Sequence, residues 1–274
     1  MQRDPLRGRL AAEHMEPSQL GFDAHELDEV FRFWANKACM KNPKLLKQFK
    51  SKEIGELDLS VLPGASDEHL AAIRHYSKLA KLNISYCTLS PTAIADFDKL
   101  TALQDLTING ANIDDLAFSK LKILSQLSTL EAKEAPAFSK TIAALAGSSN
   151  IQKLVLCNGA LTDQNVKLIG KNTSLIYLNL ALNPAITSEG VKALINCKQL
   201  KNLNLIQDPI TPSAISTLSS LKELTSLKLS CLNWKEVDEI ALKRNLPENC
   251  SLQIIHMKSA KAGKDLDNLT RIGL

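Results

Sequence analysis

Six cysteines and five histidines are the residues of this chain best suited to nucleophilic or metal chemistry. A cysteine nucleophile needs a base within hydrogen-bond reach, and a structural zinc site needs Cys and His ligands at short spacings. Every cysteine stands alone, without a Cys-x-x-Cys pair or a histidine at ligand spacing. The six are Cys39, Cys87, Cys157, Cys197, Cys231 and Cys250. We expect reduced thiols that are buried or half-buried, and neither a disulfide framework nor a metal site.

The histidines are dispersed as widely as the cysteines. His69 and His75 lie six residues apart and would not share a helix face, and His14, His25 and His256 lie outside the regular part of the sequence. The sequence contains no G-x-S-x-G, H-E-x-x-H or phosphate-binding glycine loop. We therefore predict a protein that is not an enzyme, with no catalytic residue, no cofactor and no metal.

The composition favours an aliphatic interior and a soluble chain. Hydrophobic residues make up 45% of the 274 residues but aromatic residues only 4%, and the net charge of +4 is spread over segments of mixed sign. Such a mild charge gives no reason to expect nucleic-acid binding. No apolar run approaches the roughly 18 residues of a membrane span, and the N-terminus lacks a signal-peptide core. We expect no membrane association and a cytoplasmic monomer.

The pattern L-x-x-L-x-L organises most of the chain, and its clearest copy runs from Leu175 to Leu180. Eight copies open at a nearly constant interval, with steps of 25, 24, 24, 24, 24, 25 and 24 residues. The opening residues are Ile54, Leu79, Leu103, Leu127, Ile151, Leu175, Leu200 and Leu224. Such a regular period indicates stacked repeats, each of which begins with a short strand.

A second apolar pair follows each of the first seven strands and predicts a short helix, because its two members are three residues apart. The pairs are Leu70/Ile73, Ile94/Phe97, Phe118/Leu121, Ile142/Leu145, Val166/Ile169, Val191/Leu194 and Ile215/Leu218. Residues typical of helix N-caps precede most of them, namely Ser90, Asp114, Ser139, Thr162, Thr187 and Thr211. In the two 25-residue steps the extra residue falls between strand and helix, where a loop absorbs it at little cost.

This string and period resemble the leucine-rich repeat family over residues 54–256. The helical outer elements are similar to those of the ribonuclease-inhibitor-like and cysteine-containing subclasses, in which a Cys or Asn follows the strand and bonds the turn. That position here holds Cys87, Ala111, Ala135, Gly159, Asn183 and Asp208. The resemblance implies an α/β solenoid, or horseshoe, with a parallel β-sheet on the concave face and α-helices on the convex face. Eight strands would give a concave face about 35 to 40 Å long.

Four segments are expected along the chain. Residues 1–21 form a flexible lead, 22–53 a helical N-terminal cap, 54–256 eight repeats with a closing strand, and 257–274 a C-terminal tail or small cap. In the cap, Asp23 is a candidate N-cap residue for a helix that reaches about Ala38, with one apolar face of Leu27, Val30, Phe31 and Trp34. Asn42 and Pro43 would open a second short helix. The basic run from Lys37 to Lys52 is interpreted as a solvated face, with an anion-binding patch as the alternative.

The concave face is the candidate site. Charged residues dominate its first half, whereas repeats five to seven pair amides with apolar groups, and a rigid Tyr among aliphatic side chains with a polar rim is typical of a binding hot spot. The predicted partner-binding residues are Val155, Tyr177, Asn179, Leu182, Asn204 and Ile206. As an alternative, Leu182 packs into the following turn and Ile206 is a scattered surface residue. Glu131 and Lys133 mark the competing site in the charged half.

The leading functional hypothesis is a non-enzymatic module that binds a protein partner on its concave face. A second hypothesis follows from the family resemblance: a substrate-receptor subunit of a ubiquitin-ligase assembly, or a pathogen effector that imitates one and is delivered into a host cytosol. It requires the helices of residues 22–53 to form a divergent F-box. A third hypothesis, an enzyme with an unrecognised site on those helices, has little support in the sequence.

Overall fold

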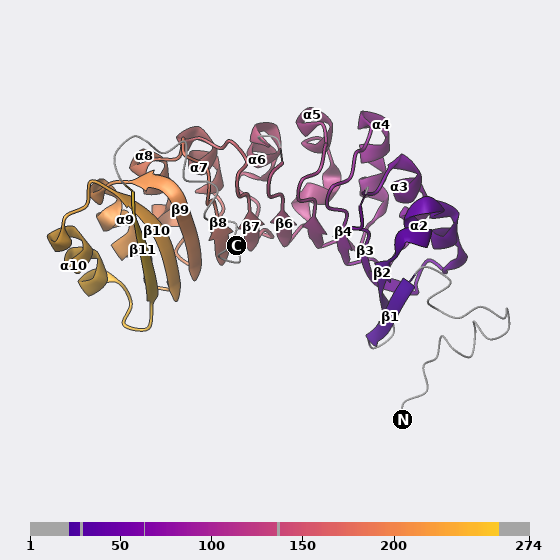
Figure 1. Ribbon diagram of the computed structural model, residues 1–274, viewed down its shortest axis with the longest axis horizontal. Coiled ribbons are helices and arrows are strands. Elements are labelled where there is room, and N and C mark those ends of the chain that lie inside the picture. The colour runs from indigo at the N-terminus through magenta and orange to yellow at the C-terminus, as the bar shows by residue number, and fades with distance from the viewer. Residues whose placement is uncertain (1–21, 28–29, 63, 136–137, 258–274) are drawn as a thin grey trace, which may run out of the picture.

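The computed structural model describes residues 22–27, 30–62, 64–135 and 138–257. The chain forms an arched solenoid in which the strands line the inner side and the helices the outer side (Figure 1). Because strands stack about 4.8 Å apart while helices need about 10 Å, a stack of such units curves with its sheet inside. The fold is that of a leucine-rich repeat solenoid, as the repeat pattern predicted.

One sheet of eleven strands runs through the molecule in chain order. The first strand is antiparallel to the second, and the ten strands from β2 to β11 are parallel. The strands are β1 (Phe22–Leu27), β2 (Val30–Ala35), β3 (Ile54–Asp58), β4 (Lys81–Asn83), β5 (Asp105–Thr107), β6 (Thr129–Glu131), β7 (Lys153–Val155), β8 (Tyr177–Asn179), β9 (Asn202–Ile210), β10 (Ser226–Leu232) and β11 (Ser251–Met257). Strands β3 to β10 correspond to the eight predicted repeats, and β11 to the closing strand.

The convex elements are short α-helices, several of which continue as 3-10 turns. They are α2 (Lys37–Lys41), η3 (Pro43–Gln48), α3 (Asp67–Ile73), α4 (Pro91–Ile94), η4 (Ala95–Lys99), α5 (Asp115–Phe118), η5 (Lys122–Ser125), α6 (Ser139–Leu145), α7 (Asp163–Ile169), α8 (Ser188–Val191), η6 (Lys192–Asn196), η7 (Pro212–Ala214), α9 (Ile215–Ser220) and α10 (Glu236–Asn245). No helix among the described residues is both long enough and apolar enough to cross a membrane.

The core lies between the sheet and the convex helices and consists of stacked aliphatic layers. Register places each central strand leucine beside its counterpart one repeat away, so that Leu154 pairs with Leu178 and Leu178 with Leu203. All three are buried. In the fourth repeat Ala132 replaces the last strand leucine. Its strand nevertheless keeps register with both neighbours, and Ala132 is buried.

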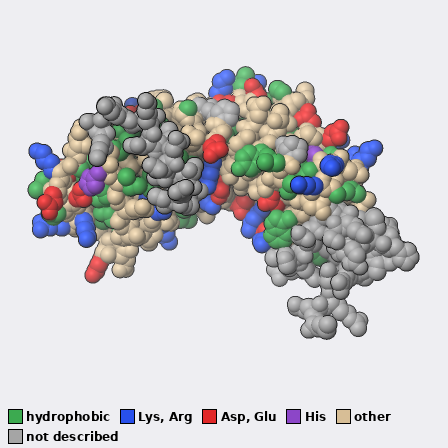
Figure 2. Space-filling view, in the orientation of Figure 1, with side chains coloured by type: hydrophobic (Ala, Val, Ile, Leu, Met, Phe, Trp, Pro, Cys, Tyr) green, Lys and Arg blue, Asp and Glu red, His purple; other side chains and the backbone are tan. Residues whose placement is uncertain are grey.

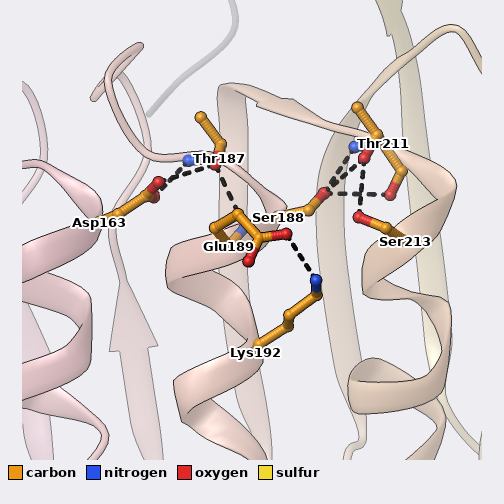
Figure 3. A network of polar contacts seen from close by, with 7 residues as sticks. All are labelled: Asp163, Thr187, Ser188, Glu189, Lys192, Thr211 and Ser213. Carbon is orange, nitrogen blue, oxygen red and sulfur yellow. Dashed lines mark hydrogen bonds and ion pairs between the residues drawn. The ribbon is translucent and has the colours of Figure 1, made fainter.

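Helix N-termini are tied to one another across the convex side (Figure 3). Asp163, the first residue of α7, accepts hydrogen bonds from the backbone N–H of Thr187 at 2.7 Å and from its hydroxyl at 2.8 Å. Thr187 is the N-cap of the next helix. One repeat further, Ser188 accepts from the N–H of Thr211, again an N-cap, at 2.8 Å. Each helix start therefore binds the next, since its exposed N–H groups need acceptors.

A left-handed residue closes the strand segment of nearly every repeat. The non-glycine members are Tyr86, Glu134, Asn158, Leu182, Gln207 and Asn233, and Gly110 occupies the same position in its repeat. Each directly precedes the turn position, which is buried in every case except Trp234, as Leu182 precedes Asn183. Side chains other than glycine are disfavoured there, so the turn geometry is imposed by the stacked hydrogen bonds on either side. The N–H of Leu182, for example, donates to the carbonyl of Ile206 at 2.8 Å.

The helix predicted from Asp23 to about Ala38 is wrong, because the chain forms the antiparallel pair β1 and β2 there. The sequence Val30 to Ala35 fits L-x-x-L-x-L as V-F-R-F-W-A, and a step of 24 residues back from Leu57 leads to its pairing partner Phe33. Aromatic and β-branched residues favour a strand. The array thus begins one strand earlier than predicted. The second predicted helix, from Pro43, is confirmed as a 3-10 helix.

The segment after β2 packs against the first repeat. Cys39, Met40 and Leu46 are buried, and the hydroxyl of Tyr76 on the return from α3 donates to the carbonyl of Leu46. Burial raises the pKa of Tyr76, which stays neutral. The lead of residues 1–21 and the tail beyond Met257 lie outside the described residues.

Candidate functional site

The concave face is formed by residues that alternate with the strand leucines, and register arranges them in rows across the sheet. One row runs through Val155, Asn179 and Asn204, which are successive partners on β7, β8 and β9. A parallel row contains Tyr177, which pairs with Lys153 on β7 and Asn202 on β9. Five of the six predicted site residues are brought together on β7, β8 and β9, and Leu182 follows shortly after β8.

An apolar cluster lies on this side of the sheet, separate from the main core. Its buried members are Val155, Cys157, Ala181 and Ile206, with exposed fractions of 2%, 8%, 2% and 4%, and Tyr177 and Ile255 pack against it half-buried. We call these six residues the concave cluster. Of the predicted partner-binding residues, Val155, Asn204 and Ile206 are buried.

The two asparagines among the predicted site residues, Asn179 and Asn204, have a structural role as well. Asn179 accepts a hydrogen bond from the N–H of Ala181 at 3.1 Å, and Asn204 accepts one from the N–H of Ile206, also at 3.1 Å. Asn83 makes the same bond to the N–H of Ser85 in the second repeat. These contacts fix the backbone where the strand ends. Leu182 is half-buried in the left-handed turn, and its backbone rather than its side chain sets the geometry.

The first half of the concave face is a charged hollow of about 360 Å³. Arg32 forms an ion pair with Glu56, which also lies 3.0 Å from Lys81. Further along, Lys153 pairs with Glu131 at 2.5 Å. The hydrogen bond from Arg32, with Lys81 nearby, lowers the pKa of Glu56. Glu56 and Glu131 are thus paired with cations of this hollow, whereas Asp58 and Asp105 accept hydrogen bonds from neutral side chains.

Arg32 and Trp34 of the hollow were missed by the sequence interpretation. The guanidinium of Arg32 lies 5.6 Å from the ring centre of Trp34, within cation-π range. Both residues line the hollow from β2. The signal that could have found them is the degenerate repeat copy in Val30–Ala35, in which Arg32 and Trp34 flank Phe33 and so fall on the concave side.

Asp208 is buried beneath this face, in the last part of β9. One carboxylate oxygen accepts from the N–H of Asn183 at 2.8 Å, while the other has no hydrogen-bond partner among the described residues. Burial raises the pKa of Asp208 to about 8. At the equivalent place one repeat earlier, the amide of Asn183 donates to the carbonyls of Leu156 and Leu180 at 2.9 and 2.6 Å. A protonated Asp208 has an O–H donor, which corresponds to the N–H donor of the Asn183 amide at the equivalent position.

Cys157 on this face is not a reactive cysteine. Burial raises the pKa of the Cys157 thiol to about 11, so that it carries almost no nucleophilic thiolate at neutral pH. His69 is buried in the first repeat helix and contacts Ser66, far from the concave cluster. Within the described ranges no group of three or more His, Cys, Asp or Glu residues could hold a metal ion.

The fold and the concave rows together define a solenoid of the leucine-rich repeat type. Neither a protein-family model nor a curated protein sequence matches the chain. Among solved structures, internalin C2 of Listeria monocytogenes is similar with a TM-score of 0.52 and 21% identity, over 69% of this chain and 76% of that one. An internalin (inlF) from the same organism aligns with a TM-score of 0.40 and 14% identity, over 77% and 75% of the two chains. At such identities the first likeness speaks for the fold alone.

Proposed function

We propose that this protein is a non-enzymatic interaction module whose concave face binds a protein partner through the concave cluster. The observation that carries the proposal is the cluster itself, an apolar group on the side of the sheet opposite the main core. Apolar side chains gathered there contribute nothing to the stacked layers. An aromatic residue beside aliphatic ones, flanked by charged groups, is the composition that protein interfaces concentrate at their centre.

The charged hollow next to the cluster would form the polar rim of the same interface. The ammonium of Lys153 lies 5.4 Å from the ring centre of Tyr177 and connects the two regions. Rim charges mostly steer association and set its salt dependence, whereas the apolar centre supplies affinity. We therefore assign the affinity to Val155, Tyr177 and Ile206, with Asn179, Leu182 and Asn204 holding the backbone beneath them.

The experiment is affinity purification from the native cells, followed by a comparison of two variants against the captured partner. Changing Tyr177 and Ile206 to Ala should weaken binding by about 2 kcal/mol, roughly 30-fold. Reversing Glu131 and Lys133 should change binding less and mainly alter its salt dependence. The proposal is wrong if the first variant binds normally and the reversal abolishes binding, because the charged hollow would then be the site.

The finer assignments belong to the same proposal. The short convex helices support a ribonuclease-inhibitor-like or cysteine-containing subclass, and we propose a cytoplasmic monomer. The ubiquitin-ligase alternative depended on helices in residues 22–53. Strands β1 and β2 occupy the first part of that segment, so the described structure gives no observation that favours an F-box.

A further inference from the structure

The burial of the concave cluster is unusual for side chains on the open side of a sheet. Val155 lies in a row of the sheet between Glu131 and Asn179, and both of these neighbours are only half-buried. All three residues lie on strands that have a parallel strand on either side. Val155 is 2% exposed and Ile206 4%. Among the described elements, helices α3 to α8 lie on the outer side of the arch, and none of them crosses the concave face (Figure 1).

The space-filling view shows cations and carboxylates near the middle of the arch, and hydrophobic side chains on both halves of the visible face (Figure 2). The cluster continues to the end of the sheet through Ile255 of β11. Strand β11 finishes two residues later at Met257, and residues 258–274 follow. The described chain therefore ends at the border of the concave cluster.

We propose that residues 258–274 are the occupant of the concave cluster, so that the chain carries its own ligand for this surface. From β11 to β7 there are four strand spacings, about 19 Å, and seventeen residues span about 25 Å even in the most compact regular conformation, the α-helix. The segment carries Leu266, Leu269 and Ile272 at spacings of three, with charged or polar residues between them. Such a sequence matches an apolar strip bordered by charges, such as Lys153 and Glu131.

The consequence is autoinhibition of the surface proposed above for a protein partner, and this second part rests on that proposed function. A tethered segment binds with an effective concentration in the millimolar range, so a partner must compete with it. Displacing the segment would then raise the affinity for the partner, because the competing contact is lost.

Cys157 provides a direct readout of whether the cluster is covered, since it is the only cysteine among the six cluster residues. Cys39, Cys87, Cys197 and Cys231 are buried in the main core and report on the integrity of the fold. Cys250 is half-buried and would be replaced, C250S, in every protein used. The full chain is treated with a maleimide at neutral pH, and modification at each cysteine is followed by mass spectrometry.

The test variant changes Leu266, Leu269 and Ile272 to Ser in the full chain, and the matched control changes Lys261, Asn268 and Thr270 to Ser. The test variant should react at Cys157 at least tenfold faster than the parent, while the control keeps the parental rate. Cys197 and Cys231 should remain unmodified in all three proteins. An unchanged rate at Cys157 in the test variant would overturn the proposal. Protection that disappears on dilution of the parent would also overturn it, by showing that a second copy covers the cluster.

Partner binding separates this inference from the proposed function. If both are right, the test variant reacts faster at Cys157 and captures its partner at least tenfold better. A different outcome is also informative: the test variant reacts faster at Cys157, but partner binding is unchanged both in this variant and in the variant with Tyr177 and Ile206 changed. That outcome would support the docked segment and refute the proposed partner site.

Discussion

Glu56 and Asp208 are two carboxyl groups at opposite ends of the same concave face, and their environments shift their pKa values in opposite directions. Glu56 lies in the charged hollow, where Arg32 and Lys81 lower its pKa. Asp208 lies beneath the apolar half, where burial raises its pKa to about 8. In the first half of the face the Glu56 carboxylate is therefore paired with cations. In the second half the buried Asp208 carboxyl group is instead kept in its neutral, protonated form. Identical backbone repeats can support both solutions because the side chains alternate freely on that face.

This contrast predicts opposite pH dependences for the two regions. Glu56 contributes stability above its unfolded pKa of roughly 4, and that contribution is lost as pH falls through its lowered folded pKa. Asp208 contributes stability that is complete below roughly 4. That contribution is lost as pH rises through about 8, because the folded state then gives up a proton that it binds more tightly than the unfolded chain.

The largest effect is expected for Asp208→Asn. The amide can donate as Asn183 does, so the variant should be more stable than the parent at pH 9 and similar to it near pH 4. Each unit of raised pKa corresponds to about 1.4 kcal/mol, which gives up to about 6 kcal/mol between the two limits. Urea unfolding at a series of pH values measures this difference. A parent whose stability is flat from pH 5 to 9 would show that Asp208 is not held protonated.

The next largest effect tests whether the two halves share one core behind their different faces. Leu82→Ala behind the charged hollow and Leu203→Ala behind the concave cluster should each cost about 2 to 5 kcal/mol, since both side chains are fully buried. If chemical denaturation gives equal losses of unfolding free energy for the two variants, the difference between the two halves is confined to the concave side of the sheet. A loss below half a kilocalorie in either variant would contradict the proposed register there.

A smaller effect is expected for the asparagines that end the strands. Asn204→Ala leaves the N–H of Ile206 without its acceptor beneath the apolar half, and should cost about 1 to 3 kcal/mol. Asn83→Ala, which frees the N–H of Ser85 in the charged half, should cost less because the Asn83 side chain is half-buried, whereas Asn204 is buried, so that water can take the place of the lost amide. Thermal unfolding of both variants provides the comparison, and the reverse order of losses would contradict a drier second half.

The smallest effect belongs to the ion pair between Lys153 and Glu131. Both side chains are partly exposed, so Glu131→Gln should cost less than about 1 kcal/mol, and the loss should shrink further in molar salt. A loss above 2 kcal/mol at high salt would show that the charged hollow is drier than its lining residues indicate.

The repeat period allowed most of the fold to be predicted, because a leucine that recurs every 24 or 25 residues leaves one stacking register. The antiparallel strand β1 could not be predicted in this way, since it belongs to no repeat, and Val30–Ala35 was hidden because its aromatics also fit a helix face. In the site, the alternation identified Val155, Tyr177 and Ile206 correctly as concave. The burial of Val155 and Ile206 could not be predicted, because periodicity gives the side of the sheet but not what lies over it.

The chain of bonds between helix starts has a consequence for how the solenoid opens. Asp115 binds Thr141, Ser139 contacts Asn165, Asp163 binds Thr187 and Ser188 binds Thr211. Repeats three to seven are thereby joined by hydrogen bonds between their helix starts as well as by their core. If one helix in this stretch unwinds, the start of the next helix loses a hydrogen-bond acceptor. In a hydrogen-exchange experiment these repeats should release their protected amides together, in one slow phase, while the ends of the array exchange sooner.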